Sequence, residues 1–285
     1  MAAPVTSKPS SGSAILRAAL SGLLIMSLCL GLAAPEAQAH ARRHARTARH
    51  GPERIVRRGV VLDRRGLINR ALLRAALRSL RAHSAQVTDR DRIAIVDLSR
   101  PSYLPRFYLL SLDDGSVLSV VTTHGRGSDP DQTGRAVRVS NVQGSLASST
   151  GAYVTGEAFD SLTHLSRAIR LDGLDTTNSS ARCRCIVIHE ANRMDGQNYA
   201  SQAWISAHVG NDGKGQAGRS DGCFAFSDED FAYILPRMAP GTFIYAGPAQ
   251  LPQWTPVVAP TDCCPEAALP NGSQPARRLA PAALP

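Results

Sequence analysis

The 285-residue sequence predicts a mainly β fold with few helices, and three observations support this. Short runs rich in β-branched and aromatic residues, bounded by turn residues, recur between residues 92 and 247. Helical periodicity is confined to two segments. Apolar residues make up 43% of the chain, which is enough to form a core. A chain of this length is expected to contain one or two domains.

Residues 1–39 have the pattern of a signal peptide. Lys8 and Arg17 form a basic start, an apolar run follows, and AQA at 37–39 fits a small-residue cleavage site. The run is short and interrupted by Ser and Gly, which favours a cleaved signal over a membrane anchor. An uncleaved anchor remains the alternative, and export is expected in either case.

Positive charge is concentrated near the N-terminus. Residues 42–81 contain 13 arginines against Glu53 and Asp63, although the net charge of the chain is only +9. Residues 40–65 are predicted to be a basic disordered linker, because 40–58 lack an apolar period. For an exported protein, an anionic lipid or envelope polymer is a better partner for the arm 40–58 than nucleic acid. A solvated tail without a partner remains equally open.

A helix is predicted over residues 66–83. Apolar residues recur there at helical spacing, and four arginines line another face. We expect the helix to pack on the following domain, with contact to a membrane surface as the alternative.

The predicted strands follow in order along the chain. They are 92–98, 106–112, 116–125, 151–159, 167–174, 183–191 and 241–247. Asp113-Asp114-Gly115 predicts a hairpin between the second and third of them. The strand 183–191 has a continuous apolar centre and is expected to be buried on both faces. A short helix is predicted over 228–238, starting at Ser227. The Pro/Ala-rich residues 248–285 are predicted to be an extended tail.

Removal of the signal leaves five cysteines, and an odd number in an oxidising compartment points to one unpaired thiol. Strand alternation places Cys183 and Cys185 on one face of the predicted strand, so they are not expected to bond to each other. We expect at least one disulfide from this pair to Cys263 or Cys264 in the tail. It would close a loop of about 80 residues and leave Cys223 outside any disulfide.

Cys223 lies in the segment Ser220-Asp221-Gly222-Cys223. Gly222 permits a turn that aims successive N–H groups at one point, as an oxyanion hole requires. From these residues alone, a nucleophile and a buried structural cysteine are equally plausible. A thiolate needs a basic partner, and the histidines considered are His189, His124 and His208. No Cys/His pair has zinc-ligand spacing, so no metal site is predicted.

Six motifs occur in an order that resembles the L,D-transpeptidases of bacterial peptidoglycan, of the YkuD type. They are DLSRPS at 97–102, THGRGSD at 123–129, SNVQGSLASSTGAYVTGE at 140–157, IRLDGLD at 169–175, IVIHEA at 186–191 and GRSDGC at 218–223. The resemblance covers about residues 66–247. It implies a β-sandwich or mixed-sheet catalytic domain, no cofactor, peptidoglycan stem peptides as partners, and a place in the periplasm or cell envelope of a bacterium.

The resemblance also implies roles for individual residues. Cys223 matches the nucleophile and His189 its general base. The loop of Ser220, Asp221 and Gly222 shapes the site, with the Gly222 and Cys223 amides as oxyanion donors. The residues that the resemblance assigns to substrate binding are His124, Tyr153, Thr155 and Arg219.

The sequence departs from the family pattern at several points. An inserted loop is expected at 192–216, because His189 and Cys223 are 34 positions apart. Glu190 stands where a glycine is common. An anionic Asp221 beside the nucleophile would disfavour a thiolate. The alternatives to a transpeptidase are an L,D-carboxypeptidase, a non-catalytic peptidoglycan-binding module, and an adhesin-like surface protein directed by its basic arm.

Overall fold

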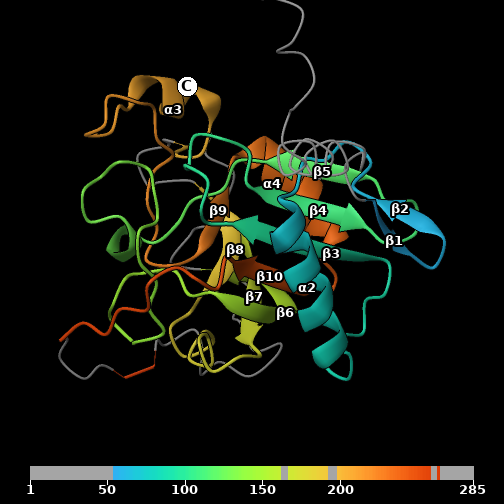
Figure 1. Cartoon of the computed structure of the whole chain (residues 1–285). Coiled ribbons are helices and arrows are strands. Elements are labelled where there is room, and N and C mark those ends of the chain that lie inside the picture. Colours follow the sequence, from blue (N-terminus) through green and yellow to red (C-terminus); the bar gives the residue numbers. More distant parts are fainter. Residues whose placement is uncertain (1–53, 162–165, 192–197, 258–261, 264–285) are drawn as a thin grey trace, which may run out of the picture. The chain divides into compact units, whose positions relative to one another are not determined.

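The computed structural model describes residues 54–161, 166–191, 198–257 and 262–263, all within one compact unit that runs from Arg54 to Pro285. The predicted signal peptide 1–39 and the first part of the basic arm, up to residue 53, lie outside the described residues. Figure 1 shows the arrangement of the elements.

The central feature is an eight-stranded mixed sheet, which confirms the predicted mainly β fold (Figure 1). Its strand order is β5-β4-β3-β10-β6-β7-β8-β9. The strands are β3 Arg92–Asp97, β4 Phe107–Ser111, β5 Val117–Val120, β6 Gly151–Ser161, β7 Ser166–Gly173, β8 Val187–Glu190, β9 Phe224–Phe226 and β10 Phe243–Gly247. Neighbours are antiparallel except for β10 with β3 and β8 with β9, which are parallel. The hairpin predicted at Asp113-Asp114-Gly115 joins β4 to β5.

Apolar side chains on the two faces of the sheet form two separate clusters. Along β3, Ile93 and Ile95 belong to one cluster and Ala94 and Val96 to the other, as strand alternation requires. Helix α2 (Arg70–Ala82) packs into the first cluster, and helix α4 (Asp228–Ile234) packs into the second. The sheet is therefore covered on both faces, which explains why its central strands are apolar throughout.

Helices α2 and α4 each begin at a side-chain cap. Asn69 Oδ1 accepts from the amides of Ala71 and Leu72 at the start of α2. The predicted cap Ser227 accepts from the Asp230 amide at the start of α4, and a short 3-10 turn η2 (Leu235–Arg237) containing Pro236 follows that helix. None of the helices in the described part of the chain is long and apolar enough to cross a membrane.

The prediction of an irregular linker is wrong for its last residues. A hairpin forms there from β1 (Ile55–Arg57) and β2 (Val60–Leu62). Arg58 and Gly59 both have positive φ, of +49° and +81°, as the two central residues of a tight hairpin turn. Ile55, Val60 and Leu62 point to the α2 side of the sheet, as strand residues do. The surrounding arginines obscured this strand pattern in the sequence.

Strand β8 starts later than predicted. It begins at Val187, and the preceding residues from Asp175 to Cys185 form turns. Cys183 and Cys185 therefore do not share one face of a strand, and Cys185 has a φ of +51°. The cause is local: the Ile186 amide donates to Ala181 O, which closes the last turn immediately before the strand.

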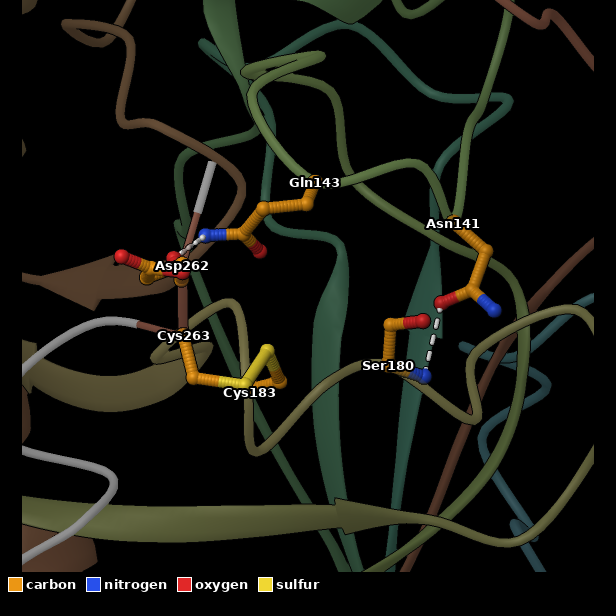
Figure 2. The surroundings of a disulfide bond; sticks show 6 residues. All are labelled: Asn141, Gln143, Ser180, Cys183, Asp262 and Cys263. Carbon is orange, nitrogen blue, oxygen red and sulfur yellow. Dashed lines mark hydrogen bonds between the residues drawn. A yellow bond between two sulfur atoms is a disulfide. The ribbon is translucent and has the colours of Figure 1, made fainter. Parts of the chain in front are cut away.

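The predicted link between this region and the tail is nevertheless present. Cys183 and Cys263 form a disulfide across a sequence separation of 80 (Figure 2). Cys185 is also disulfide-bonded, and Cys223 is outside any disulfide. The tail runs along the domain before this link. Val139 exchanges backbone hydrogen bonds with Pro252 and Trp254, and Gln143 Nε2 donates to Asp262 O at 3.3 Å.

Removal of the Cys183–Cys263 link should lower stability without changing the fold. The substitution pair Cys183→Ser and Cys263→Ser is expected to reduce the free energy of unfolding by up to about 4 kcal/mol, because the link closes a long loop in the unfolded chain. The loss will be smaller if the disulfide of Cys185 constrains the same loop. Urea unfolding of the oxidised variant and wild type measures the difference, and equal midpoints would contradict this account.

Candidate active site

Cys223 ends a tight turn that directly precedes β9. The Ser220 hydroxyl organises this turn, because it accepts from the Gly222 amide at 3.2 Å and donates to Cys223 O at 2.7 Å. Gly222 has a φ of +124°. A Cβ there would lie 2.8 Å from both Ala147 O and Ile186 Cδ1. Only glycine fits this position, for reasons of both backbone conformation and space.

The turn also corrects one expectation. The Gly222 N–H already donates to Ser220 Oγ within the turn, so we do not assign it as an oxyanion donor. Ser220 keeps its predicted role in shaping the loop.

The parallel pairing of β8 with β9 brings the turn that ends at Cys223 next to His189. Ile188 is opposite Phe224, and His189 is opposite Ala225. Two residues 34 positions apart in sequence thus come to the same edge of the sheet. His189 and Cys223 both line one cavity.

The ring of His189 has a defined tautomer. Its Nδ1 lies 2.6 Å from Glu190 O, and a carbonyl oxygen can only accept, so Nδ1 carries the proton. Nε2 is then the basic nitrogen, as a general base for a thiol requires. Cys223 is 5% exposed, and its Sγ donates to Cys185 O at 3.4 Å.

The cavity has a volume of about 230 Å³. Its lining residues are His189, Tyr199, Trp204, Gly218, Arg219, Ser220, Asp221 and Cys223. One wall comes from the expected insertion, in which helix α3 (Gln202–Ala207) begins at a Ser201 cap. The Trp204 ring stacks on His208 at 3.5 Å between centroids. Sequence reasoning missed this wall, although Ser201 before an apolar-containing run was a usable helix signal.

His208 does not line the cavity. It is exposed, and its Nδ1 is bonded to Trp204 O. Among the histidines considered from sequence, the structure therefore brings only His189 to Cys223.

His124 supports the turn of residues 220–223 from inside the protein. Its side chain has no exposed surface, so the expectation of a substrate contact is not met. Instead the Ser220 amide donates to His124 O, and the Arg126 amide donates to Ser220 O. Arg106 Nη2 donates to His124 Nδ1 at 2.7 Å, which leaves the ring proton on Nε2, directed at Asp129 Oδ2 3.6 Å away.

Tyr153 and Thr155 are also buried and do not reach the cavity. The Tyr153 hydroxyl bonds to Ser149, and burial raises its pKa to about 12, so it stays neutral. Thr155 Oγ1 donates to Ala239 O at 2.6 Å, in the loop before β10. The resemblance assigns both residues to substrate binding, but both side chains are buried in this part of β6.

The charged residues of the turn lie at the cavity mouth. Asp221 is exposed and forms an ion pair with Arg126 at 2.8 Å. Its negative charge is therefore both paired and solvated, which weakens the predicted effect on the thiolate. Arg219 lines the cavity as predicted and donates from Nη1 to Asp129 O at 2.7 Å.

The described residues were also considered as ligands for a metal ion. Among the described residues, no group of three His, Cys, Asp or Glu side chains is placed to hold a metal ion.

Comparison with known proteins gives a family match. The model of the L,D-transpeptidase catalytic domain family matches residues 65–246. A solved structure of an L,D-transpeptidase from Mycobacterium smegmatis is 11% identical, with a TM-score of 0.31, and the match covers 55% of this chain and 59% of that chain. No curated protein matches this chain.

His124 predicts how stability changes with pH. Burial and the nearby Arg106 charge lower its pKa to about 4, below the usual 6.5 that applies in the unfolded chain. The unfolded state thus binds the proton first, and stability falls as pH drops from about 6.5 to 4. The loss from this group is about 3 kcal/mol. His124→Gln keeps an acceptor for Arg106 but does not titrate. Urea unfolding at pH 7 and pH 4.5 should show a smaller pH-dependent loss in the variant, and equal losses would refute the assignment.

Asp221→Asn should change the reactivity of Cys223 by less than about threefold, because an exposed, paired charge has little influence. The rate of iodoacetamide alkylation of Cys223 across pH measures this. An acceleration of tenfold or more at neutral pH would show that Asp221 does oppose the thiolate.

Proposed function

Because the chain belongs to the L,D-transpeptidase catalytic domain family, we propose that it transfers acyl groups of peptidoglycan stem peptides through a thioester on Cys223. The observation that carries this proposal is the shared cavity of Cys223 and His189 on paired strands, with Nε2 of His189 as the basic nitrogen.

The first half-reaction forms the thioester. His189 Nε2 takes the thiol proton, and the Cys223 sulfur attacks the carbonyl carbon of the penultimate stem residue, a diamino acid. The carbonyl π electrons move onto oxygen, and the Cys223 amide is the proposed donor to that oxyanion. The C–N bond to the terminal D-alanine then breaks, and the imidazolium returns its proton to the leaving amine.

The second half-reaction releases the enzyme. An acceptor amine attacks the thioester carbonyl, His189 takes the amine proton, the C–S bond breaks, and the imidazolium returns the proton to the Cys223 sulfur. An amide cross-link, or attachment to a lipoprotein, is the product with an amine. Water as the acceptor would give an L,D-carboxypeptidase instead.

Arg219 is the proposed contact for the donor peptide. Its guanidinium lines the cavity and has further N–H donors beyond the one bonded to Asp129 O. In the leaving D-alanine, the α carbon is bonded to the scissile nitrogen and carries the carboxylate. A cation at the cavity edge suits that group, since arginine binds carboxylates in a defined geometry.

The setting of the reaction is also part of the proposal. The signal-like residues 1–39 support export to the periplasm or cell envelope, where the polymer lies. The arm 40–58 is proposed to hold the protein near an anionic lipid or envelope polymer through its arginines.

Mass spectrometry after incubation with disaccharide-tetrapeptide tests the function. We expect an acyl adduct on the peptide that contains Cys223, with release of D-alanine. Cys223→Ala should give no adduct and keep the fold, because only the thiol is lost. His189→Gln should slow adduct formation by about 10² to 10⁴. His208→Gln is the matched control and should retain the wild-type rate.

Three outcomes would overturn parts of this mechanism. Turnover by Cys223→Ala near the wild-type rate removes the nucleophile. A greater loss in His208→Gln than in His189→Gln removes the base. Binding of the peptide with neither adduct nor D-alanine release makes the protein a peptidoglycan-binding module.

A further inference from the structure

Arg184 is a buried cation that pairs with no carboxylate among the described residues. It is 9% exposed, and its guanidinium donates hydrogen bonds to neutral oxygens. Nη1 donates to Ser140 O at 2.8 Å and to Ser149 Oγ at 3.4 Å, and Nη2 donates to Ala147 O. No carboxylate in the described part of the chain forms an ion pair with it.

A permanent charge in this position is costly. Removing a guanidinium from water is unfavourable, and carbonyl dipoles compensate less than an anion would. The group next to this charge should therefore explain why a charged side chain is present.

Arg184 faces the nucleophile turn. A Cβ at Gly222 would lie 3.2 Å from Arg184 Nη2, so the guanidinium lies directly against the residue before Cys223. On the other side, the Cys223 thiol donates to the carbonyl of Cys185, the residue after Arg184. The main chain of this segment thus contacts the Cys223 thiol, and its Arg184 side chain lies against the neighbouring Gly222.

We propose that Arg184 is a positioning residue whose fixed positive charge stabilises the Cys223 thiolate from the protein interior. The inference deepens the proposed function, since it concerns the same nucleophile. It gives the thiolate a counter-charge that does not depend on protonation of His189. It also places that charge on the side away from the cavity, where it does not obstruct the substrate.

Other titratable groups around Cys223 do not supply such a charge. His189 on β8 must be neutral to act as a base, and Tyr153 on β6 is kept neutral by burial. In the turn itself, Asp221 is exposed and paired with Arg126, whereas Arg219 is at the cavity edge. Burial lowers the pKa of Arg184, and negative charge on Tyr153 or Cys223 acts in the opposite direction.

The neighbouring disulfide explains how Arg184 is held in place. Cys183, one residue before it, is bonded to Cys263, and the Arg184 amide donates to Ser180 O (the region of Figure 2). The segment is therefore fixed on the N-terminal side of Arg184. Its guanidinium then donates to Ser140 O, Ser149 Oγ and Ala147 O in the 140–149 loop.

Alkylation of Cys223 tests the role of the charge. The full oxidised chain is treated with iodoacetamide across pH, and the Cys223 peptide is followed by mass spectrometry. Arg184→Gln should move the midpoint upward by about one pH unit, so that alkylation below the midpoint is about tenfold slower. Arg184→Lys keeps a charge but loses the fork, and its midpoint should stay nearer the wild type. Ser149→Ala removes one Arg184 contact but no charge and should leave the midpoint unchanged.

Two results would overturn the proposal. Wild-type midpoints in both Arg184 variants would make the residue a structural tie for the loop. Equal shifts in Arg184→Gln and Arg184→Lys would show that geometry, not charge, is responsible.

A second measurement leaves Arg184 in place, in case its variants do not fold. At pH 8, where an ordinary imidazole is neutral, Cys223→Asp should be more stable to urea than the isosteric Cys223→Asn, because the buried cation gains an anion. Lower stability of Cys223→Asp would contradict a positive potential at this position. None of these measurements requires turnover, so they are informative even if no acyl adduct forms with the tetrapeptide.

Discussion

The parallel pairing of β8 with β9 is the constraint on which the site depends. It joins two short strands that are far apart in sequence and sets His189 beside the residue pair that follows Cys223. Because β9 is the last strand of the sheet, the turn before it lies at an edge and opens to solvent on one side. A nucleophile needs both features: a rigid backbone to fix its position and an open side for the substrate.

That edge strand is held by polar groups in the interior as well as by the sheet. Thr123 makes three of these bonds: its amide donates to Ala225 O, and its hydroxyl bonds to the Ala225 amide and Cys223 O. The Ser148 hydroxyl donates to Gly222 O. Each buried group is costly unless it is paired, so the turn and the two loops around it favour one arrangement together. The two histidines differ in their tautomers. His189 has a basic Nε2 and lines the cavity, whereas His124 carries its proton on Nε2 and directs it at the buried Asp129.

The strands of the sheet could be predicted because their signals are local. Alternation and turn residues identify β3, β4 and β10 without any knowledge of their partners. The hairpin at Arg58 was missed because arginine-rich composition suggested disorder, although the turn geometry was encoded by Gly59. The start of β8 was misplaced because Cys-Arg-Cys continues into an apolar run, and only the tertiary structure shows that a turn closes before Ile186.

The site could be predicted in part, for a related reason. Sequence order identified Cys223 and His189, but it could not show whether a motif residue faces the substrate or the core. Two residues illustrate this. Tyr153 belongs to the motif at 140–157, and Arg184 lies two residues before the motif at 186–191, yet both side chains are buried. A nucleophile can be activated from either side. Here the exposed side carries Asp221, whose charge is solvated and paired, while the buried side carries a cation in a medium that screens it far less. If the Arg184 proposal holds, the environment beneath the turn, rather than Asp221, should dominate the state of the thiol.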